Sequence, residues 1–336
     1  MPKVSIIILN WNGLRDTIEC LESLKKIIYP NYEVIVVDNG SRGNDVDILE
    51  EKFGRYIRLI RNEENLGFAQ GNNIGISRAL EDKDCKYIFC LNNDTIIEKD
   101  SLDNLLFFAE NEKYDNFGSF QPKMIWYYHP EVIDSVGLDY SKNGLGFNRG
   151  GFEPVDKYNN IEEIFGCCGG AVLYRRSVIE WLISQDGYAF DPEFFAYYED
   201  IDISLRLQLM ESRSLFVPGS VILHKRGGSA NKISKKTLYW GHRNNIYVLA
   251  KNIPLRFLLK NVFLILFAEL ASIGINFIKR GSLGFTIMEA KVVGFLRWGR
   301  FRTKGSVLRK SCSRENWGRI EKMFITKWRV KSHPYV

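Results

Sequence analysis

Four short apolar runs, each followed by a polar loop and a stretch of helical character, occupy about the first ninety residues of the 336-residue chain. The runs at 4–9, 33–37, 57–60 and 87–91 are nearly continuous, which is typical of strands buried on both faces of a parallel sheet. The stretches near 16–26, 45–53 and 65–80 would form the right-handed crossovers between them. The sequence therefore predicts an α/β fold with a mostly parallel, Rossmann-like central sheet covered by helices.

Polar side chains follow the predicted strands where each strand ends. Asn10, Asp38 and Asp94 all lie just beyond such an end, so we expect them to converge on one crevice. A carboxylate there can hold a divalent cation and, through it, phosphate oxygens. The alternative is that these residues only form turns and cap the helices that follow. The loop after the first strand has a single glycine, Gly13, and so lacks the dinucleotide fingerprint, which argues against a hydride-transfer enzyme.

A second group of acidic residues begins a predicted helix. Glu199, Asp200 and Asp202 stand at the start of an apolar-periodic run at positions 201, 205 and 209. A positioned carboxylate can remove a proton from a hydroxyl group. Acids in the first turn of a helix are also stabilised by its macrodipole whatever their function, so both interpretations remain open.

The middle of the chain gives weaker signals. The section 117–151 predicts mixed strands and loops, with His129 a loop residue. Gly169 and Gly170 lie in a small-residue turn entering a buried strand, where a missing side chain serves either a ligand or close packing. His224 ends the apolar run 221–224, as a metal ligand or as a partner of the adjacent loop.

Charge divides the chain into two parts. Up to residue 224 there are 22 Lys and Arg against 36 Asp and Glu, whereas residues 225–336 carry 24 against 4. A basic third of this kind predicts an anionic partner, either nucleic acid or a membrane surface. No nucleic-acid motif accompanies the charge, so we rank the anionic membrane surface first and expect no nucleic acid.

An apolar stretch at 253–278 also favours a membrane surface over nucleic acid as the partner. Within 262–278 only Glu269, Ser272 and Asn276 are clearly polar, and they fall on one helical stripe. A central charge makes a poor spanning helix, so an interfacial or re-entrant helix fits better. A buried helix with a soluble basic tail is the alternative. The basic residues expected near lipid are Lys251, Arg256, Lys260, Lys279, Arg280, Arg297, Arg300, Arg302, Lys304, Arg309 and Lys310.

The cysteines and the N-terminus bear on the compartment. The six cysteines lack paired metal-site spacing, and several fall in predicted core strands, which predicts reduced, structural thiols. The apolar run after Lys3 is too short for a signal peptide and lacks a cleavage site. We therefore expect a cytoplasmic protein, peripheral on the inner face of the cell membrane.

Five motifs taken in order resemble family 2 glycosyltransferases of the GT-A fold, and within them the rhamnosyltransferase-like members. The similarity runs from Val4 to about Ser229, two thirds of the chain. It implies domains at 1–230, with a nucleotide-binding half (1–115) and an acceptor and catalytic half (116–230), and a helical, basic region at 231–336. The motifs are Leu9-Asn10-Trp11-Asn12-Gly13, Val37-Asp38-Asn39-Gly40-Ser41, Asn65-Leu66-Gly67-Phe68, Leu91-Asn92-Asn93-Asp94 and Tyr198-Glu199-Asp200-Ile201-Asp202.

The resemblance implies roles for individual residues. Asp200, beside Glu199, is the expected general base, Asp38 bonds the pyrimidine, and Tyr197 and Tyr198 stack on the acceptor unless they belong to the core. Asp94 and His224 hold Mg²⁺ or Mn²⁺, although Asn92 stands where the family usually has a first acid. The residues implied to hold the donor are Asn10, Asn12, Asp38, Asn65, Gly67, Asn72, Asn93, Gly169 and Gly170.

These roles imply an inverting glycosyltransferase. It would move a sugar, with rhamnose suggested by the resemblance alone, from a uridine- or thymidine-diphosphate donor to a hydroxyl of a lipid-linked glycan. Two alternatives remain open at this point. One is a non-catalytic nucleotide-sugar or glycan-binding subunit of a membrane polysaccharide assembly complex, and the other is a nucleotide-sugar hydrolase.

Overall fold

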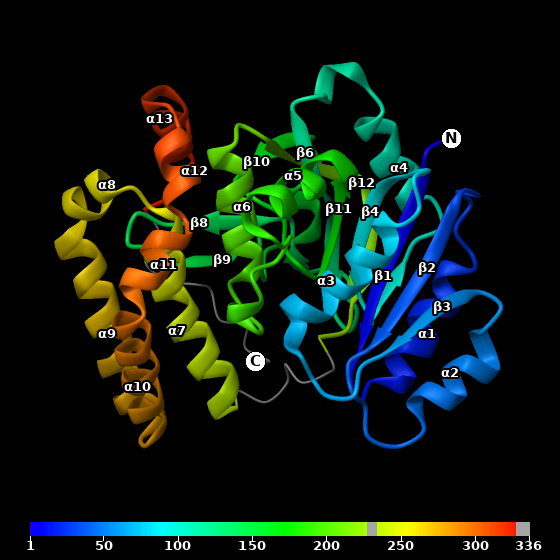
Figure 1. Cartoon of the computed structure of the whole chain (residues 1–336), viewed down its shortest axis with the longest axis horizontal. Coiled ribbons are helices and arrows are strands. Elements are labelled where there is room, and N and C mark those ends of the chain that lie inside the picture. The colour runs from blue at the N-terminus through cyan, green and yellow to red at the C-terminus, as the bar shows by residue number, and fades with distance from the viewer. Residues whose placement is uncertain (227–233, 327–336) are drawn as a thin grey trace.

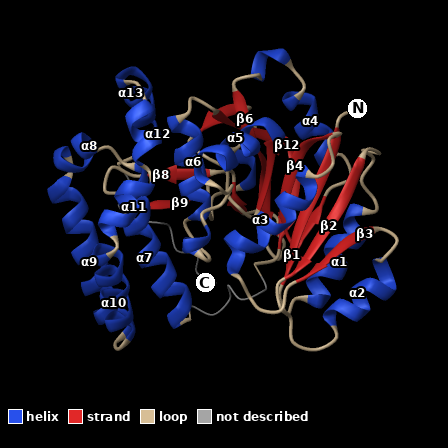
Figure 2. Cartoon of the chain, viewed as in Figure 1, coloured by secondary structure: helices blue, strands red, loops and turns tan. Residues whose placement is uncertain are grey.

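The computed structural model describes residues 1–226 and 234–326, and a twisted sheet lies at its centre (Figures 1 and 2). The sheet has ten strands within these residues, and β8 (Leu138–Tyr140) and β9 (Gly146–Asn148) form a separate pair. The ten are β1 (Lys3–Asn10), β2 (Tyr32–Asp38), β3 (Ile57–Arg61), β4 (Cys85–Asn92), β5 (Thr95–Ile97), β6 (Phe117–Trp126), β7 (Ile133–Ser135), β10 (Glu162–Ile164), β11 (Ala171–Arg175) and β12 (Arg213–His224).

The strand order confirms the predicted parallel sheet. Strands β3, β2, β1 and β4 lie side by side and all parallel, with Asn10 opposite Asp38 in the register. Strand β11 then runs antiparallel between β4 and β6, and β12 pairs parallel with β6. The carboxyl ends of β1, β2 and β4 therefore meet at one edge, as the apolar runs predicted.

Helices cover both faces of the sheet because alternate strand residues point to opposite sides. Ile6 and Ile8 join the core cluster that contains residues of α1, α2 and α4, whereas Ile7 joins the cluster with residues of α3 and α5. Both clusters take residues from α6. These helices are α1 (Leu14–Leu24), α2 (Asp45–Phe53), α3 (Gly67–Leu80), α4 (Ser101–Ala109), α5 (Arg176–Asp186) and α6 (Glu199–Leu209).

Two glycines let α3 lie close against β1. A Cβ atom at Gly71 would be 2.4 Å from Leu9 Cδ1, and one at Gly75 would be 2.5 Å from Ile7 Cγ2. Larger residues would push the helix away from the strand. This packing holds the N-terminus of α3 beside the carboxyl end of β1.

The C-terminal residues form a helical region at one end of the sheet (Figure 1). Helix α7 packs against α6 of the sheet domain and against α10 and α11, and α10 in turn packs against α9. The helices are α7 (Lys235–Asn252), α8 (Leu255–Lys260), α9 (Val262–Arg280), α10 (Leu283–Leu296), α11 (Trp298–Lys304), α12 (Ser306–Ser311) and α13 (Arg314–Met323).

Buried ion pairs join this region to the sheet domain. Lys251 of α7 is 1% exposed, and its Nζ lies 2.9 Å from Asp191 Oδ2 and 2.8 Å from Asp202 Oδ2. Lys304 adds a second ammonium 2.9 Å from Asp191 Oδ1. Burial alone would raise the pKa of Asp191, but the two lysines outweigh it and hold that pKa well below its usual range.

Helix α9 presents its apolar side to the outside. Its polar stripe turns inward, where Glu269 forms a buried ion pair with Lys291 of α10 and accepts a hydrogen bond from Asn245 of α7 (2.8 Å). The stretch Val262–Lys279 is long and apolar enough to cross a membrane, and 17% of it is buried inside the protein. The exposed apolar residues of α9 and α10 are Phe263, Leu266, Phe267, Leu270, Ile275, Ile278, Phe285, Met288, Val292, Phe295 and Leu296.

Three details of the C-terminal prediction were wrong. The apolar stretch 253–278 is divided between α8 and α9 and is not one helix. Lys251 and Lys304, expected near lipid, lie in the ion pairs with Asp191. Arg302 and Arg309 donate hydrogen bonds to backbone carbonyls of the 250–253 segment. The two arginines bind within the protein because the end of α7 and the loop after it leave carbonyl oxygens to be satisfied, and the two lysines do so because Asp191 and Asp202 are buried carboxylates.

The thiols follow the prediction. All six cysteines are free, and five of them are buried. Burial raises the pKa of Cys90, for example, to about 12, so it stays an uncharged thiol in the core at neutral pH.

Replacing Lys251 with methionine should destabilise the fold. The variant Lys251→Met leaves Asp202 buried without its ammonium partner, and breaking a buried pair in this way costs about 3–5 kcal/mol. Denaturant unfolding at pH 7 measures the loss. Lys260→Met is the control, because that lysine is 68% exposed and its loss should change stability by less than about 0.5 kcal/mol. Equal effects of the two substitutions would contradict the prediction.

Candidate active site

Polar side chains link the ends of the three neighbouring strands β2, β1 and β4. The buried Asn10 amide donates to Asp38 Oδ2 (2.7 Å), and Asn10 Oδ1 accepts from Thr17 Oγ1 (2.7 Å). Asn93, after β4, donates to the same Thr17 hydroxyl (2.9 Å). The structure therefore brings Asn10 and Asp38 into direct contact, and it connects the loop after β4 to them through Thr17.

The residues predicted to hold a pyrimidine are themselves held in place. Asp38 is 1% exposed and accepts hydrogen bonds from Asn10 and from the Ser41 backbone N–H (2.9 Å). Asn12 has a positive φ of 51°, and its backbone N–H donates to Ser41 Oγ (2.8 Å). Hydrogen bonds thus connect the loops after β1 and β2.

Asn39 is a residue that the sequence prediction did not select. Its amide donates to Asn65 Oδ1 (3.0 Å) and to Gly67 O (3.1 Å), and its Oδ1 accepts from the Leu66 N–H (3.2 Å). Asn39 therefore fixes the loop that enters α3. The sequence signal for this role was the position of Asn39 directly after Asp38, in a motif of turn residues. A role in the turn alone explained that position equally well.

The loop before α3 lies close to the backbone at Phe195, and Gly67 allows this contact. Asn65 Oδ1 accepts from the Gly67 N–H (2.8 Å), and Gly67 has φ +83°. A Cβ at Gly67 would lie 2.5 Å from the Phe195 carbonyl oxygen. Asn72 differs from the prediction, because its 2% exposed side chain donates back to Phe68 O (2.9 Å) and supports the helix.

His224 lies between two carboxylates. Its Nε2 is 3.1 Å from Asp94 Oδ1 and its Nδ1 is 2.7 Å from Asp134 Oδ2. The pairing of β12 with β5 sets this arrangement, since His224 is opposite Thr95, the residue after Asp94. Asp134 comes from the short strand β7 and was missed, because the sequence around it carries no strand or motif signal.

The two carboxylates change the protonation of His224. Burial would lower its pKa, but Asp134 and Asp94 outweigh burial and raise the pKa to about 10. The imidazole is therefore a cation at neutral pH when no metal ion is bound. Burial raises the pKa of Asp134, but His224 and Arg226 more than offset this and keep that pKa below its usual value.

The donor set fits a divalent cation. The described residues contain no cluster of three or more His, Cys, Asp or Glu side chains around one point, so Asp94 and His224 stand as a pair. Two protein ligands suffice where substrate phosphates and waters complete the shell. Asp134 on the second ring nitrogen also matches the carboxylate that orients a ligating histidine.

The two cations after His224 have acidic partners. Lys225 Nζ lies 2.9 Å from Asp16 Oδ1 and 2.6 Å from Glu19 Oε2, both in α1, and Arg226 pairs with Asp134. Residues 227–229, at the end of the stretch that resembles the family, lie outside the described residues.

Gly169 and Gly170 connect the strand ends to the predicted base. The Gly169 N–H donates to Asp200 Oδ2 (3.3 Å), and the Gly170 carbonyl accepts from the Asn92 N–H (2.9 Å). A Cβ at Gly170 would be 2.7 Å from Met124 Cε, so this glycine is also needed for packing. The packing interpretation is therefore confirmed at Gly170, and the ligand interpretation stays a prediction.

The adjacent acids Glu199 and Asp200 differ in environment. Glu199 is 7% exposed, and its Oε2 has no hydrogen-bond partner among the described residues. Burial and then Asp200 raise the pKa of Glu199 well above its usual range. Burial also raises the pKa of Asp200, but the N–H groups of Gly169 and Ile201 favour its ionised form. Asp200 is thus the member of the pair that ionises first.

The aromatic residues before these acids lie in a strained loop. Phe195, Tyr197 and Tyr198 have φ angles of 65°, 71° and 68°, which bulky residues rarely adopt. Tyr197 is 40% exposed, whereas Tyr198 packs against the core. Only Tyr197 of the predicted pair therefore offers an open aromatic surface.

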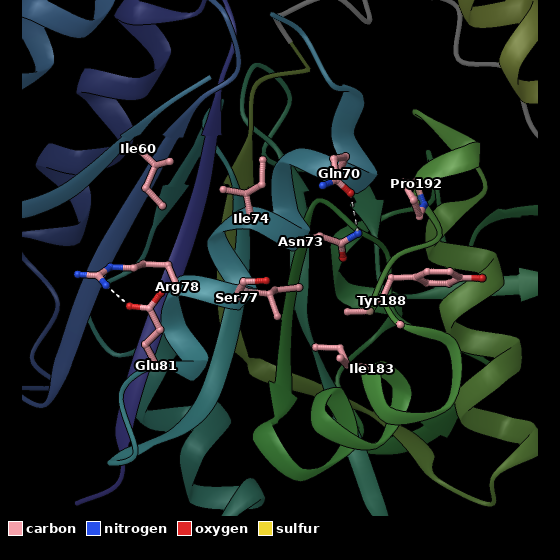
Figure 3. A pocket seen from close by; sticks show the side chains of 13 residues that line it. Ile60, Gln70, Asn73, Ile74, Ser77, Arg78, Glu81, Ile183, Tyr188 and Pro192 are labelled. Carbon is pink, nitrogen blue, oxygen red and sulfur yellow. Dashed lines mark hydrogen bonds and ion pairs between the residues drawn. The ribbon is translucent and has the colours of Figure 1, made fainter. Parts of the chain in front are cut away.

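A groove of about 420 Å³ lies beside this site and not within it (Figure 3). Side chains from α3, among them Gln70 and Ser77, form one wall, and Ile183 and Tyr188 form the other. None of the predicted site residues lines it. His129 lies in a loop, as predicted.

Comparison with known proteins agrees with these motifs. Residues 5–182 match the model of Glycosyl transferase family 2. The chain is 25% identical over 212 residues to the Low-salt glycan biosynthesis hexosyltransferase Agl10 of Haloferax volcanii, covering 61% of this chain and 62% of that protein. It is 26% identical over 257 residues to the Rhamnosyltransferase WbbL of Escherichia coli K12, covering 74% and 93%.

The fold also has a solved counterpart. The crystal structure of GalNAc-T7 with UDP, GalNAc and Mn²⁺ aligns with a TM-score of 0.59 at 18% identity, covering 75% of this chain and 48% of that one. Together with the family match over more than half of the sequence, the ordered motifs identify the protein: the chain belongs to the family 2 glycosyltransferases, with a GT-A fold.

Proposed function

We propose that the protein is an inverting, metal-dependent glycosyltransferase. It moves a sugar from a nucleoside-diphosphate sugar to a hydroxyl of a growing, lipid-linked glycan. The observation that carries the proposal is the Gly169–Gly170 turn, which bonds Asp200 on one side and the Asn92 backbone on the other. The proposed base, Asp200, is thus connected to the end of β4, and Asp94, the proposed acidic ligand of the metal ion, lies just beyond that end.

Asp200 is the general base in this mechanism. Its carboxylate takes the proton of the acceptor hydroxyl while the oxygen forms a bond to the anomeric carbon and the bond to the diphosphate breaks. One displacement at this carbon inverts its configuration. Glu199, whose pKa is raised well above its usual range, keeps its proton and leaves Asp200 as the ionised acid beside it.

Asp94 and His224 would hold Mg²⁺ or Mn²⁺. When bound, such a cation stabilises the negative charge of the departing diphosphate. Asp134 keeps its hydrogen bond to Nδ1 of His224, so that Nε2 carries the free electron pair that a metal ligand needs. Asn92 has no charge, and we therefore expect tight metal binding only with the nucleotide present.

The donor nucleotide would lie along the loops after β1 and β2 and at the start of α3. Asp38 can accept from the ring N–H that uracil and thymine share, so UDP- and dTDP-sugars are the proposed donors. The macrodipole of α3 favours phosphate near the N-terminus of this helix. Rhamnose is the sugar to test first, because the Escherichia coli relative is named a rhamnosyltransferase.

The outward apolar face of α9 and α10 supports a place on the inner face of the cell membrane. Apolar side chains recur along the outside of both helices, and exposed cations remain at Arg256, Lys260, Lys279, Arg297 and Lys310. Such a face gains from burial in the lipid interface and from attraction to anionic headgroups. We propose a peripheral attachment through this face, with the helical region beyond residue 230 as the attachment domain.

Nucleoside diphosphates should stabilise the protein in the presence of Mn²⁺. A nucleotide at about 100 times its Kd adds about 2.7 kcal/mol to the unfolding free energy, which thermal unfolding detects. UDP or dTDP should give a shift that depends on the metal, and Asp94→Asn should remove the dependence. Asp47→Asn is the control, since that side chain is 78% exposed on α2. A full metal-dependent shift in Asp94→Asn would contradict the metal assignment.

Asp200→Asn should lower the transfer rate by about 10²–10⁴-fold while nucleotide binding persists. Because the base must be ionised and its pKa is raised, the wild-type rate should fall with decreasing pH at a midpoint above about 4, the value of an unperturbed aspartate. Measurements of kcat/KM against pH test both statements. Wild-type protein that binds the nucleotide but transfers no sugar to any glycan acceptor would favour the non-catalytic binding subunit.

Wild-type protein should float with vesicles that contain anionic lipid, and salt should weaken the binding. Charged side chains on the lipid face oppose burial, so Phe267→Glu combined with Leu270→Glu should reduce flotation at least tenfold, as expected for about 1.4 kcal/mol or more. Phe107→Glu on α4 is the control, because Phe107 is equally exposed but lies on the sheet domain. Equal flotation of the α9 double variant and wild type would contradict the proposed attachment.

A further inference from the structure

One side chain of the C-terminal region binds the carbonyl groups of the loop that leads to Asp200. Asn244 of α7 is fully buried, and its amide donates to Phe194 O (2.8 Å), Ala196 O (2.9 Å) and Tyr197 O (2.7 Å). An amide has two hydrogens, so at least one of them is shared between two carbonyls. A single residue thus satisfies three acceptors in a segment of four.

The backbone conformation of that loop is one that bulky residues rarely adopt without support from their surroundings. Phe195 has φ 65° and ψ −66°, and the Ala196 N–H donates to Phe194 O (2.8 Å), which together make the rare γ-turn with positive φ. Tyr197 and Tyr198 follow with φ of 71° and 68°. Strained residues of this kind persist only where the surroundings hold them, and they concentrate at functional sites.

Contacts from two sides hold the loop. On the donor side, the Ala69 N–H of α3 donates to Phe195 O (3.1 Å). On the other side, the Arg243 guanidinium donates to Phe194 O (3.1 Å), and the ring of Trp240 lies 4.5 Å from that of Phe195 between centroids. The loop is therefore clamped between the helix that begins the donor site and α7.

The loop determines where the catalytic helix begins. The Tyr198 carbonyl accepts from the Asp202 N–H (2.9 Å), so the first turn of α6, which carries Asp200, starts from the last strained residue. A displaced loop would move Asp200 with it.

We propose that Asn244 is a positioning residue for the transfer reaction, which holds the strained 194–198 loop and thereby places Asp200 against its acceptor. The inference rests on the proposed function for the role of Asp200. The clamping of the loop by Asn244 stands on the hydrogen bonds alone.

The next residue provides a matched control. Asn245 has the same side chain, lies on the same helix and is 1% exposed, but its amide donates to Glu269 of α9 (2.8 Å). Its loss should cost stability in the same helical region without touching the loop.

Kinetics of three variants test the proposal in the full-length protein. Asn244→Ala should lower kcat by about 10²-fold at saturating donor and acceptor, because small misplacements of a catalytic group have effects of that size. Asn244→Asp, which keeps the volume but loses the donor hydrogens, should fall by a similar factor. The thermal shift given by UDP with Mn²⁺ should change little in either variant. Asn245→Ala should keep kcat within about threefold. Equal losses in Asn244→Ala and Asn245→Ala, or an unchanged kcat in Asn244→Ala, would overturn the proposal.

Amide hydrogen exchange gives a second measurement that needs no transfer reaction. Peptides covering residues 190–202 should lose protection at least tenfold in Asn244→Ala and remain protected in Asn245→Ala. Unchanged protection in Asn244→Ala would overturn the proposal. If Asn244→Ala does not fold, Asn244→Ser, which retains one donor, is judged by the same criteria. An inactive wild-type protein would contradict the proposed function, and the exchange result alone would then decide on the loop.

Discussion

The buried ammonium of Lys251 between Asp191 and Asp202 is the interaction on which the rest of the molecule depends. Asp191 stands at the start of the segment that carries the strained loop, and Asp202 lies in the first turns of α6. The same lysine therefore fixes the two ends of the segment 191–202, which carries the proposed base, and anchors α7 to the sheet domain. Once α7 is placed in this way, Asn244 faces the loop and Asn245 faces α9. The C-terminal helices are part of the structure that shapes the catalytic loop, in addition to any contact with lipid.

Much of the fold could be predicted from the sequence because the relevant signals are local. The apolar runs of β1, β2 and β4 are largely buried on both faces of the sheet, whereas β3 is an edge strand and is only partly buried. The polar residues after the buried strands fall at one edge for geometrical reasons that hold for any parallel sheet. The helix beginning at Glu199 followed from its periodicity. The register of β12 against β5, which brings His224 to Asp94, depends on residues 130 apart in the sequence, and no local pattern specifies it. The resemblance to a family supplied that pairing in advance.

The residues that were missed share a physical reason. Asp134, Asn39 and Asn244 act through hydrogen bonds to groups that are distant in the sequence, and their own neighbourhoods look like ordinary turns or helix. For some basic residues of the C-terminal region, the prediction named an external partner, whereas their side chains bind within the protein. A count of charges treats every lysine as exposed, but Lys251 and Lys304 form ion pairs with carboxylates that are 49 or more residues away in the sequence. Charge composition therefore does not predict which basic residues are exposed and which are buried in ion pairs.

The pairing of β12 with β5 also bears on the order in which the protein acquires its parts during synthesis. Strands β1 to β4 and helices α1 to α3 are complete by residue 92. Their apolar side chains can therefore pack together while the ribosome is still making the rest of the chain. His224 joins Asp94 only after more than a hundred further residues, and Lys251 and Asn244 come later still. At about 5–20 residues per second, the nascent chain has its first four strands for about 8–30 seconds before Lys251 is made and the 194–198 loop can be held in place. Until the last helices have docked, this nascent chain lacks both the proposed metal pair and the contacts that place Asp200.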